Sequence, residues 1–339
     1  MTKISQQPNN PVRIVALGGG TGLSSVLRGL KEYVATPKDP AVQPIADLAA
    51  IVTVTDDGGS SGRLRREYRV LPPGDIRNCM VALSKDEHLL GKLFQYRFPV
   101  GRALAGHSFG NLFLTALTNV TGDFPRAVRV CSEVLAIRGR IFPSTAENVT
   151  LEAELEDGSK VSGETNISRS RKRIHRVHLV PRRVRPLQEV LAAIRAADLI
   201  LVGPGSLYTS IIPNLLVEQV TETIANSHAT RVYIANLMTQ PGETQHYSVA
   251  DHVCAIYDHT RKGLFDFAVI NRRPIPPRLL RRYRAQGAEP VQRSAAQLKR
   301  MGLRYLTGDL LHHNEVVRHD QSRLTRLLLE GFIKHRARD

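Results

Sequence analysis

The chain has 339 residues, of which 42% are hydrophobic, so it is long enough to bury a large core without disulfide or metal staples. Basic residues exceed acidic ones by a net +16, which favours a small phosphorylated ligand. Aromatic residues make up only 5% and tryptophan is absent, which argues against nucleic acid as the partner. Three widely spaced cysteines argue against a disulfide framework and a zinc site.

The ends of the chain carry no signal for export or membrane insertion. Residues 1–11 are polar, lack the apolar core of a secretory signal and predict a disordered lead. No apolar stretch reaches the roughly 18 residues that span a bilayer. We therefore expect a cytoplasmic protein with no membrane span, built as one domain over residues 12–334 with a short tail at 335–339.

The first elements follow the pattern of a parallel α/β sheet. Residues 12–17 are an apolar, β-branched run that predicts a buried strand, and three glycines end it. Apolar residues at helical spacing follow over 23–34, then a proline-rich loop at 36–44 and a second strand at 48–55. Strand, glycine turn, helix and strand in this order are typical of a parallel sheet.

The same pattern returns later in the chain. We expect a helix at 190–197, a strand at 198–202, a glycine-rich turn at 203–206, a helix at 208–216, strands at 231–236 and 267–271, and an amphipathic helix at 323–335. Between the halves, about residues 145–186 alternate with period two around a hairpin turn at 156–158. The sequence thus predicts a doubly wound α/β protein with a small antiparallel β excursion, whose basic residues form a solvated face.

Two glycine-rich turns at strand ends are the first candidates for ligand binding. The run Gly18-Gly19-Gly20-Thr21-Gly22 is not a dinucleotide fingerprint, because Leu23 stands where the third glycine belongs, and this disfavours an NAD(P)-dependent oxidoreductase. It also lacks the lysine of a P-loop. Glycines at a helix start nevertheless let the backbone approach an anion, so we favour phosphate binding over a plain tight turn. Gly203, Gly205, Ser206 and Thr209 form the second turn, and together the two turns would hold one extended phosphorylated ligand.

Polar groups after the second strand form a further candidate. Asp56 and Asp57 are suited to hold Mg²⁺, contact a ribose or act as a base. Ser60, Ser61 and Arg63 follow them and are suited to hydrogen-bond phosphate oxygens. The alternative for this segment is a solvated turn that caps a helix.

Two later segments have competing interpretations. Asp75 is predicted to be an N-cap, with a ligand contact by Asp75 and Asn78 as the alternative. Residues 106–110 match the G-x-S-x-G nucleophile elbow of α/β-hydrolases, but the preceding residues look like a loop instead of the required strand. His107, Ser108 and Asn111 are therefore expected to cap a helix at 112–120 or to contact a ligand there.

Seven strings taken in order resemble the YvcK-type gluconeogenesis factor family, part of the CofD-like superfamily of 2-phospho-L-lactate transferases. They are residues 18–23, 56–64, 72–78, 106–112, 203–210, 236–244 and 318–320. The resemblance extends from residue 12 to about 333. It implies a Rossmann-like three-layer αβα fold and a cytoplasmic protein that binds UDP-N-acetylglucosamine. It further implies a role in cell shape and cell-wall synthesis during gluconeogenic growth, with Tyr283 and Arg318 in segments that match the family's sugar-nucleotide contacts.

The candidate ligand-binding residues come from all of these segments. They are Gly18, Gly19, Gly20, Thr21, Gly22, Asp56, Asp57, Ser60, Ser61, Arg63, Asp75, Asn78, His107, Ser108, Asn111, Gly203, Gly205, Ser206, Thr209, Asn236, Tyr283 and Arg318. No catalytic residue is assigned. No cofactor is expected to be required, and Asp56 and Asp57 are the candidates for an optional Mg²⁺.

Two functions remain open from the sequence. The first is a ligand-sensing regulatory protein that binds a UDP-sugar and acts on a cell-wall or cell-shape protein, with a homodimer as a further expectation. The second is a CofD-like transferase that moves a phosphorylated group from a nucleotide-diphospho donor. Both depend on one prediction: the turns around Gly20 and Gly205 face a single crevice and together bind a pyrophosphate.

Overall fold

The computed structural model describes residues 11–35, 44–85, 89–101, 103–312 and 315–336, of which 333–336 are described as backbone only. Most of the predicted lead, residues 36–43 of the proline-rich loop and residues 337–339 of the tail lie outside the described residues.

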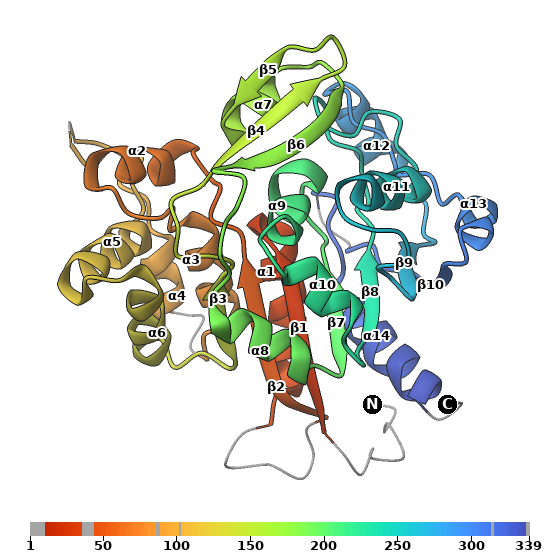
Figure 1. Cartoon of the computed structure of the whole chain (residues 1–339), viewed down its shortest axis with the longest axis horizontal. Helices are drawn as coiled ribbons and strands as arrows, with labels where there is room; N and C mark the ends of the chain where they lie inside the picture. The colour runs from red at the N-terminus through yellow and green to blue at the C-terminus, as the bar shows by residue number, and fades with distance from the viewer. Residues whose placement is uncertain (1–10, 36–43, 86–88, 102, 313–314, 337–339) are drawn as a thin grey trace.

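A seven-stranded sheet, parallel throughout, forms the centre of the molecule (Figure 1). Its strands lie side by side in the order β10 (Arg304–Gly308), β9 (Phe267–Asn271), β8 (Thr230–Ile234), β7 (Leu199–Val202), β1 (Val12–Gly18), β2 (Ile45–Val52) and β3 (Arg140–Pro143). The chain builds outward from β1 in one direction and from β7 in the other. The boundary between β1 and β7 is therefore a topological switch point, where open α/β sheets bind their ligands.

The central strands are apolar runs because both of their faces are covered. Every residue of β7 is buried, and β1 is buried after Arg13. Leu17 of β1 pairs with Val202 of β7, so both strands end at the same level and the glycines that follow each of them emerge side by side.

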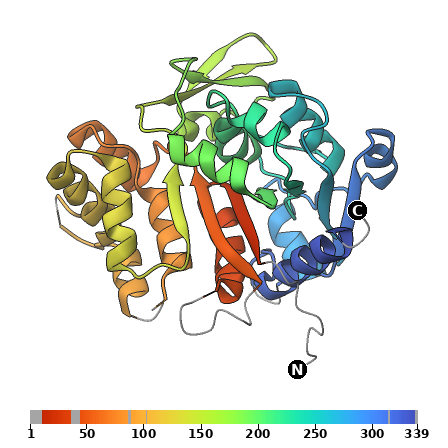
Figure 2. The ribbon, with the colours of Figure 1, turned by 60° about the horizontal axis from the view of Figure 1, so that its bottom comes forward.

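Helices cover both faces of this sheet, which gives the three-layer arrangement. Helices α1 (Gly20–Leu30), α3 (Gly74–Leu83) and α14 (Gln321–Arg336) pack beside one another behind the sheet, whereas α8 (Gln188–Ala196) and α10 (Val220–Ala225) lie in front of it (Figures 1 and 2). Right-handed crossovers that leave the switch point in opposite directions must place their helices on opposite faces. The fold class is therefore the predicted Rossmann-like αβα sandwich.

The remaining helices flank this core or carry its connections. They are η1 (Lys31–Tyr33), α2 (Gly59–Tyr68), α4 (Leu89–Gln95), α5 (Phe109–Thr121), α6 (Phe124–Val134), α7 (Glu164–Arg169), η2 (Leu207–Ile211), α9 (Ile212–Leu215), α11 (Val249–His259), α12 (Pro277–Arg284) and α13 (Ala295–Arg300). Among the described residues, none of the helices combines the length and the apolar character that a membrane crossing requires.

The predicted antiparallel excursion is a three-stranded sheet of β4 (Thr150–Leu155), β5 (Lys160–Ser162) and β6 (Ile174–Val180). Leu151, Ala153 and Leu155 alternate with polar residues and form its buried face. Figure 1 shows this sheet standing over the end of the molecule where the parallel strands finish. Its position brings α7 above the loops that carry the candidate ligand-binding residues.

Several sequence-based boundaries, three of them next to the candidate site, and one assigned role differ from the structure. Helix α1 begins at Gly20, because apolar periodicity detects only the turns after Leu23. Strand β2 ends at Val52, and the expected helix at 208–216 divides into the π-helical turn η2 and the short α9. Asp75 is not the N-cap of α3: Pro73 holds that position, and Asp75 lies inside the first turn.

Candidate functional site

The two glycine turns meet backbone against backbone at the switch point. A Cβ atom added to Gly22 would lie 2.3 Å from the carbonyl oxygen of Pro204, and one added to Gly205 would lie 3.6 Å from the carbonyl oxygen of Gly19. Gly203 adopts a left-handed conformation with φ of 83°, which glycine takes at little cost. The predicted juxtaposition of the turns around Gly20 and Gly205 is therefore present, and it requires glycine at Gly22.

Two asparagines, the buried Asn214 and the half-buried Asn236, hold these turns in place. The Nδ2 of Asn214 in α9 donates to the carbonyl oxygens of Gly18 (2.9 Å) and Ser210 (2.8 Å). Asn236, after β8, accepts the N–H of Gly205 (3.1 Å) and donates to its carbonyl oxygen (2.7 Å). Sequence reasoning identified Asn236 from its place at a strand end but missed Asn214, whose helical position gives no signal.

The turns form one wall of a crevice of about 250 Å³. The N-cap residue of α1, Gly19, has no side chain, and Asp75 accepts the N–H of Gly20 from behind the turn. The start of α1 presents the positive end of a helix to this space. Of the predicted residues, the crevice is lined by Gly19, Gly20, Thr21, Gly22, Gly205, Ser206, Asn236, Tyr283 and Arg318; its other lining residues are Ser25, Pro204, Ser210, Leu237, Met238, Gln240, Val317 and His319.

Tyr283 and Arg318 reach the crevice from the C-terminal part of the chain. The hydroxyl of Tyr283 accepts the N–H of Val317 (3.1 Å), and the carbonyl oxygen of Arg318 accepts the N–H of His312 (2.9 Å). These contacts fix the backbone on which Arg318 stands and leave its guanidinium outside the ion pairs of the described residues.

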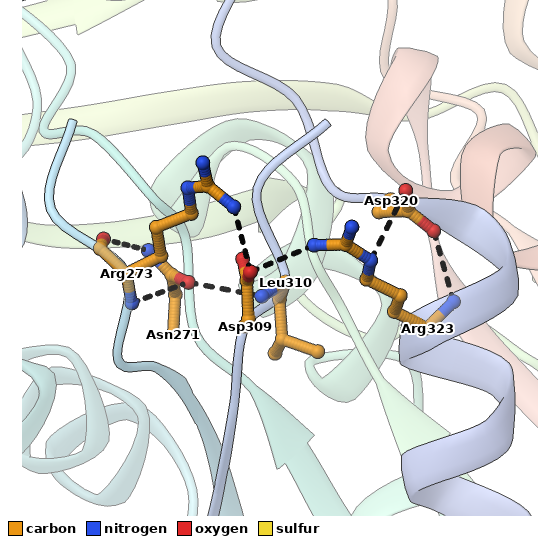
Figure 3. A network of polar contacts seen from close by, with 6 residues as sticks. All are labelled: Asn271, Arg273, Asp309, Leu310, Asp320 and Arg323. Carbon is orange, nitrogen blue, oxygen red and sulfur yellow. Dashed lines mark hydrogen bonds and ion pairs between the residues drawn. The ribbon is translucent and has the colours of Figure 1, made fainter. Parts of the chain in front are cut away.

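A polar network anchors the base of the segment that carries Arg318. Figure 3 shows Asp309 between Arg273 and Arg323, with an N–O distance of 2.8 Å to each. Asp320 accepts the N–H of Arg323 (2.9 Å) and so caps the start of α14. The oxygen Oδ1 of Asn271, at the end of β9, accepts the N–H of Leu310 (3.1 Å). The network thus ties the segment to both β9 and α14.

Beside the crevice lies a second cavity of about 780 Å³, which we call the basic chamber. It shares Thr21, Ser25, Arg318 and His319 with the crevice, so the two spaces adjoin. Its lining also includes Ser24, Arg28, Arg77, Asn78, Gln95, Arg97, His312, Glu315, Val316 and Gln321. The predicted residue Asn78 lies here, not in the crevice. Sequence reasoning did not identify Arg28 or Arg97, which no local motif connects.

Behind the first glycine turn lies a group of carboxylates, Asp56, Asp75, Glu164 and Glu243, which we call the acidic cluster. Asp75 accepts the N–H of Gly20, and burial, with the nearby charge of Asp56, raises its pKa to about 6. Burial also raises the pKa of Glu164 well above its ordinary value, and Asp56, Asp75 and Glu243 add to that rise. Protonation of these groups lowers the negative charge next to the crevice.

The candidate Mg²⁺ ligands are engaged by the protein itself. Asp57 accepts the N–H (2.9 Å) and the hydroxyl (2.7 Å) of Thr165 in α7, and Asp56 accepts the N–H of Gly58 (2.9 Å). Over the described residues, no three or more Asp, Glu, His or Cys side chains are arranged to hold a metal ion. Asp57 therefore links α7 to the core, and an Mg²⁺ held by Asp56 or Asp57 together with ligand phosphates stays a prediction.

The serine and histidine candidates join α2 to α5 instead of lining the crevice. Ser60 contacts Nδ1 of His107 (2.9 Å) and accepts from Nδ2 of Asn111 (3.1 Å). Ser108 caps α5 by accepting the N–H of Asn111 (3.3 Å), as the capping alternative predicts. No strand precedes Ser108 in the described part of residues 98–107, so the nucleophile-elbow context is missing.

The other predicted residues do not line the crevice. Arg63 donates to the carbonyl oxygen of Ala105 (2.7 Å), and Ser61 is buried against Gly74. Thr209 is buried, and its carbonyl oxygen accepts the hydroxyl of Thr55 (3.3 Å). Gly18 and Gly203 form the strand ends from which the two turns start.

These features define a doubly wound α/β protein whose ligand crevice opens at the switch point of the sheet. The chain matches the model of the family described as 2-phospho-L-lactate transferase CofD over residues 14–311, and it belongs to that family.

Named relatives place it among the gluconeogenesis factors of this family. It is 49% identical to the gluconeogenesis factor of Bacillus subtilis (strain 168), over 94% of this chain and 97% of that protein. It is 46% identical to the gluconeogenesis factor of Halalkalibacterium halodurans, over 94% of this chain and 96% of that protein. A crystal structure of a Bacillus halodurans protein superposes with a TM-score of 0.89 at 45% identity, covering 94% of this chain and all (100%) of that one.

Proposed function

We propose that this protein binds UDP-N-acetylglucosamine in the crevice and acts as a regulatory protein, not as a catalyst. The observation that carries the proposal is the close meeting of two glycine turns at the switch point, beside the start of α1. Backbone N–H groups at such a helix start favour the diphosphate of a nucleotide sugar. Arg318 adds a cation on the opposite side of the same space.

The size of the cavities also supports an extended ligand. The crevice, at about 250 Å³, is smaller than the roughly 300–1,000 Å³ typical of small-molecule sites. A nucleotide sugar would therefore extend beyond it, and the adjoining basic chamber offers the space. Tyr283 and Met238 provide apolar surface for a base or a sugar ring along the crevice.

A transferase is the alternative, and the name of the matching family model favours it. A transferase of this kind moves a phosphorylated group from a nucleotide-diphospho donor to an alcohol. Its catalysis depends mostly on positioning the two reactants and neutralising their charge. The carboxylates that such a site would use are bonded to Thr165, Gly58 and Gly20. This engagement favours binding without turnover. Incubation with a nucleotide-diphospho-lactate donor, Mg²⁺ and a deazaflavin tests the alternative, because release of nucleoside monophosphate would support it.

A thermal-shift series tests the proposal directly. Ligand at about 100-fold its dissociation constant stabilises a fold by about 2.7 kcal/mol, so UDP-N-acetylglucosamine should raise the melting temperature clearly. Arg318→Ala should remove most of this shift, because the variant loses a cation in the crevice. Arg300→Gln, on the exposed face of α13, removes the same charge elsewhere and should keep the shift. The absence of a shift with every nucleotide sugar would refute the proposal.

The cellular part of the proposal is a role in cell shape and wall synthesis during gluconeogenic growth. The relatives in Bacillus subtilis and Halalkalibacterium halodurans are named gluconeogenesis factors, and this name supports a role during gluconeogenic growth. In cells that lack the protein, Arg300→Gln should restore normal shape on a gluconeogenic carbon source, whereas Arg318→Ala should not. Equal rescue by both variants would separate the cellular role from the crevice.

A further inference from the structure

The described lining of the basic chamber holds more cations than carboxylates. Arg28, Arg77, Arg97 and Arg318 line it, and Glu315 is the one carboxylate among its described lining residues. Glu315 is exposed and lies 4.0 Å from Arg278, outside the chamber. Four guanidinium groups around a cavity of about 780 Å³ produce a local positive field, which concentrates anions.

Arg77 is the buried member of this set. Its side chain is on α3, and the residue is only 8% exposed. Nη1 donates to Ser108 (2.5 Å) and Nη2 donates to Asn78 (2.7 Å), both neutral acceptors, and Nε has no partner among the described residues. Because a guanidinium carries five N–H donors, several remain available on a side chain that is withdrawn from water.

Nearby polar atoms are also left without partners in the described structure. Nε2 of His319, a residue 7% exposed, and Nδ1 of His312 make no hydrogen bond there, and both residues line the chamber. Arg97 stands close enough to Arg77 that its charge, after burial, contributes to lowering the pKa of Arg77. Burial lowers the pKa of His319 to about 4 and its ring bonds the backbone of Ala235, so its Nε2 is an acceptor. The buried N–H without a partner is that of Arg77 Nε, and such a donor beside a second cation is costly unless an anion joins it.

We infer that the basic chamber is an oxyanion-binding subsite, in which Arg77, Arg97 and Arg318 hold a phosphoryl group. The inference rests on the proposed function only for the identity of the ligand in the neighbouring crevice. Arg318 lines both spaces, so it would contact anions on both sides. The phosphoryl group belongs either to the ligand that occupies the crevice or to a separate small phosphate monoester.

Titration with inorganic phosphate and pyrophosphate tests the subsite on the full chain at constant ionic strength. Arg97→Gln removes a chamber cation that does not line the crevice, and it should weaken binding about tenfold, the usual effect of losing one charge-assisted hydrogen bond. Arg77→Lys keeps the charge but loses the planar fork, so it should also weaken binding. Arg300→Gln serves as the matched control for net charge and should bind as the unmodified protein does.

Two arms distinguish the sources of the phosphoryl group. If saturating phosphate and UDP-N-acetylglucosamine compete, the chamber holds part of the nucleotide sugar; if both bind together, it holds a separate phosphate monoester. A protein that binds phosphate through the chamber but binds no nucleotide sugar would refute the proposed function and leave the subsite standing.

The subsite itself is refuted by either of two results. One is unchanged phosphate and pyrophosphate affinity in a folded Arg97→Gln variant. The other is an equal loss in Arg300→Gln, which would indicate a diffuse field without a built site. Arg77 also donates to Ser108, the residue that caps α5. If Arg77→Lys does not fold for this reason, the result with Arg97→Gln alone decides whether the subsite exists.

Discussion

Two polar regions border the crevice at the same end of the parallel sheet, and their charges are opposite. The acidic cluster lies behind the first glycine turn, whereas the basic chamber opens on the other side of α3. Asp75 and Arg77 belong to the same turn of α3 and project about 200° apart, since each helical residue turns by about 100°. A single helix therefore supplies one residue to each region.

The regions differ in how the chain satisfies their charges. Within the acidic cluster, Asp75 accepts the N–H of Gly20, Glu243 accepts the hydroxyl of Ser168 (3.0 Å), and burial raises the pKa of both carboxyls. In the basic chamber, the described contacts of Arg77 are to neutral groups. The comparison assigns a hydrogen-bond acceptor for the N–H of Gly20 to the acidic side and capture of an anion to the basic side.

The largest effect is expected at Gly22, where the two glycine turns meet between these regions. By helix propensity alone, Gly22→Ala would stabilise α1 by about 1 kcal/mol. The added Cβ, however, would lie 2.3 Å from the carbonyl oxygen of Pro204, which is backbone and cannot rotate away. We expect a loss of more than about 3 kcal/mol in the free energy of unfolding, together with loss of ligand binding. Chemical denaturation and a ligand thermal shift measure the two effects.

Gly263→Ala is the control for this substitution. Gly263 has φ of +72° but no atom within 4 Å of an added Cβ, so it pays only the strain of a left-handed residue, about 1 kcal/mol. If Gly22→Ala is as stable as the unmodified protein, the two turns are farther apart than the structure indicates.

The role of the acidic cluster is tested by Asp75→Asn and by how the free energy of unfolding of this variant depends on pH. The folded protein raises the pKa of Asp75 to about 6, above the ordinary 3.8, so it binds this proton more tightly than the unfolded chain does. The corresponding stability is fully present below about pH 4 and is lost as pH rises through 6. Asparagine stays neutral, so Asp75→Asn should match the unmodified protein near pH 4 and exceed it by about 2 to 3 kcal/mol above pH 7.

The difference between the two stability curves reports Asp75 together with its coupling to Glu164, whose pKa the charge of Asp75 helps to raise. Asp157→Asn gives a control of opposite sign, since hydrogen bonds with Lys172 and Ser159 lower the pKa of that exposed carboxyl. Its contribution is present above the ordinary pKa and is lost on acidification. A flat difference curve for Asp75→Asn would mean that Asp75 remains ionised without cost.

The sequence predicts the side of the sheet on which ligands bind because short apolar runs ended by glycines are local signals. Strands β1 and β7 and the turns after them are recognisable from such runs, and their pairing brings Gly18 and Gly203 together. The start of α1 at Gly20 is not recognisable, because glycines carry no side chain to show periodicity. The predicted N-cap role of Asp75 is wrong because Pro73 occupies the N-cap of α3 and Asp75 lies in its first turn.

The basic chamber lies beyond sequence reasoning for a different reason. Arg28, Arg77, Arg97 and Arg318 come from four separate segments, and only packing of α1, α3 and α14 against one another brings them around one cavity. In a chain with a diffuse basic excess, nothing marks Arg28 and Arg97 among the other arginines, whereas Arg77 and Arg318 lie in strings that resemble the family. Most residues of the crevice, by contrast, follow strands or belong to such strings.

The second glycine turn is tested by two changes at Asn236. Asn236→Ala removes both hydrogen bonds to Gly205 and should cost about 1 to 2 kcal/mol in the free energy of unfolding. Asn236→Asp keeps the acceptor for the N–H of Gly205 but adds a negative charge to the crevice wall. It should therefore lose less stability than alanine and more affinity for an anion. The reverse order would place the anion away from this turn.

The smallest effect is expected at the anchor of the Arg318 segment, on the basic side. Asp309→Asn weakens the contacts to Arg273 and Arg323 shown in Figure 3, so Arg318 is held less firmly and ligand affinity should fall a few-fold. Asp266→Asn is the matched control, because Asp266 binds Arg231 through three hydrogen bonds near the starts of β8 and β9, away from the crevice. That variant should lose stability but keep its affinity, since the amino ends of the strands lie at the opposite edge of the sheet. Titration calorimetry beside thermal denaturation separates the two outcomes, and equal affinity losses in both variants would show that general loosening, not the position of Arg318, controls binding.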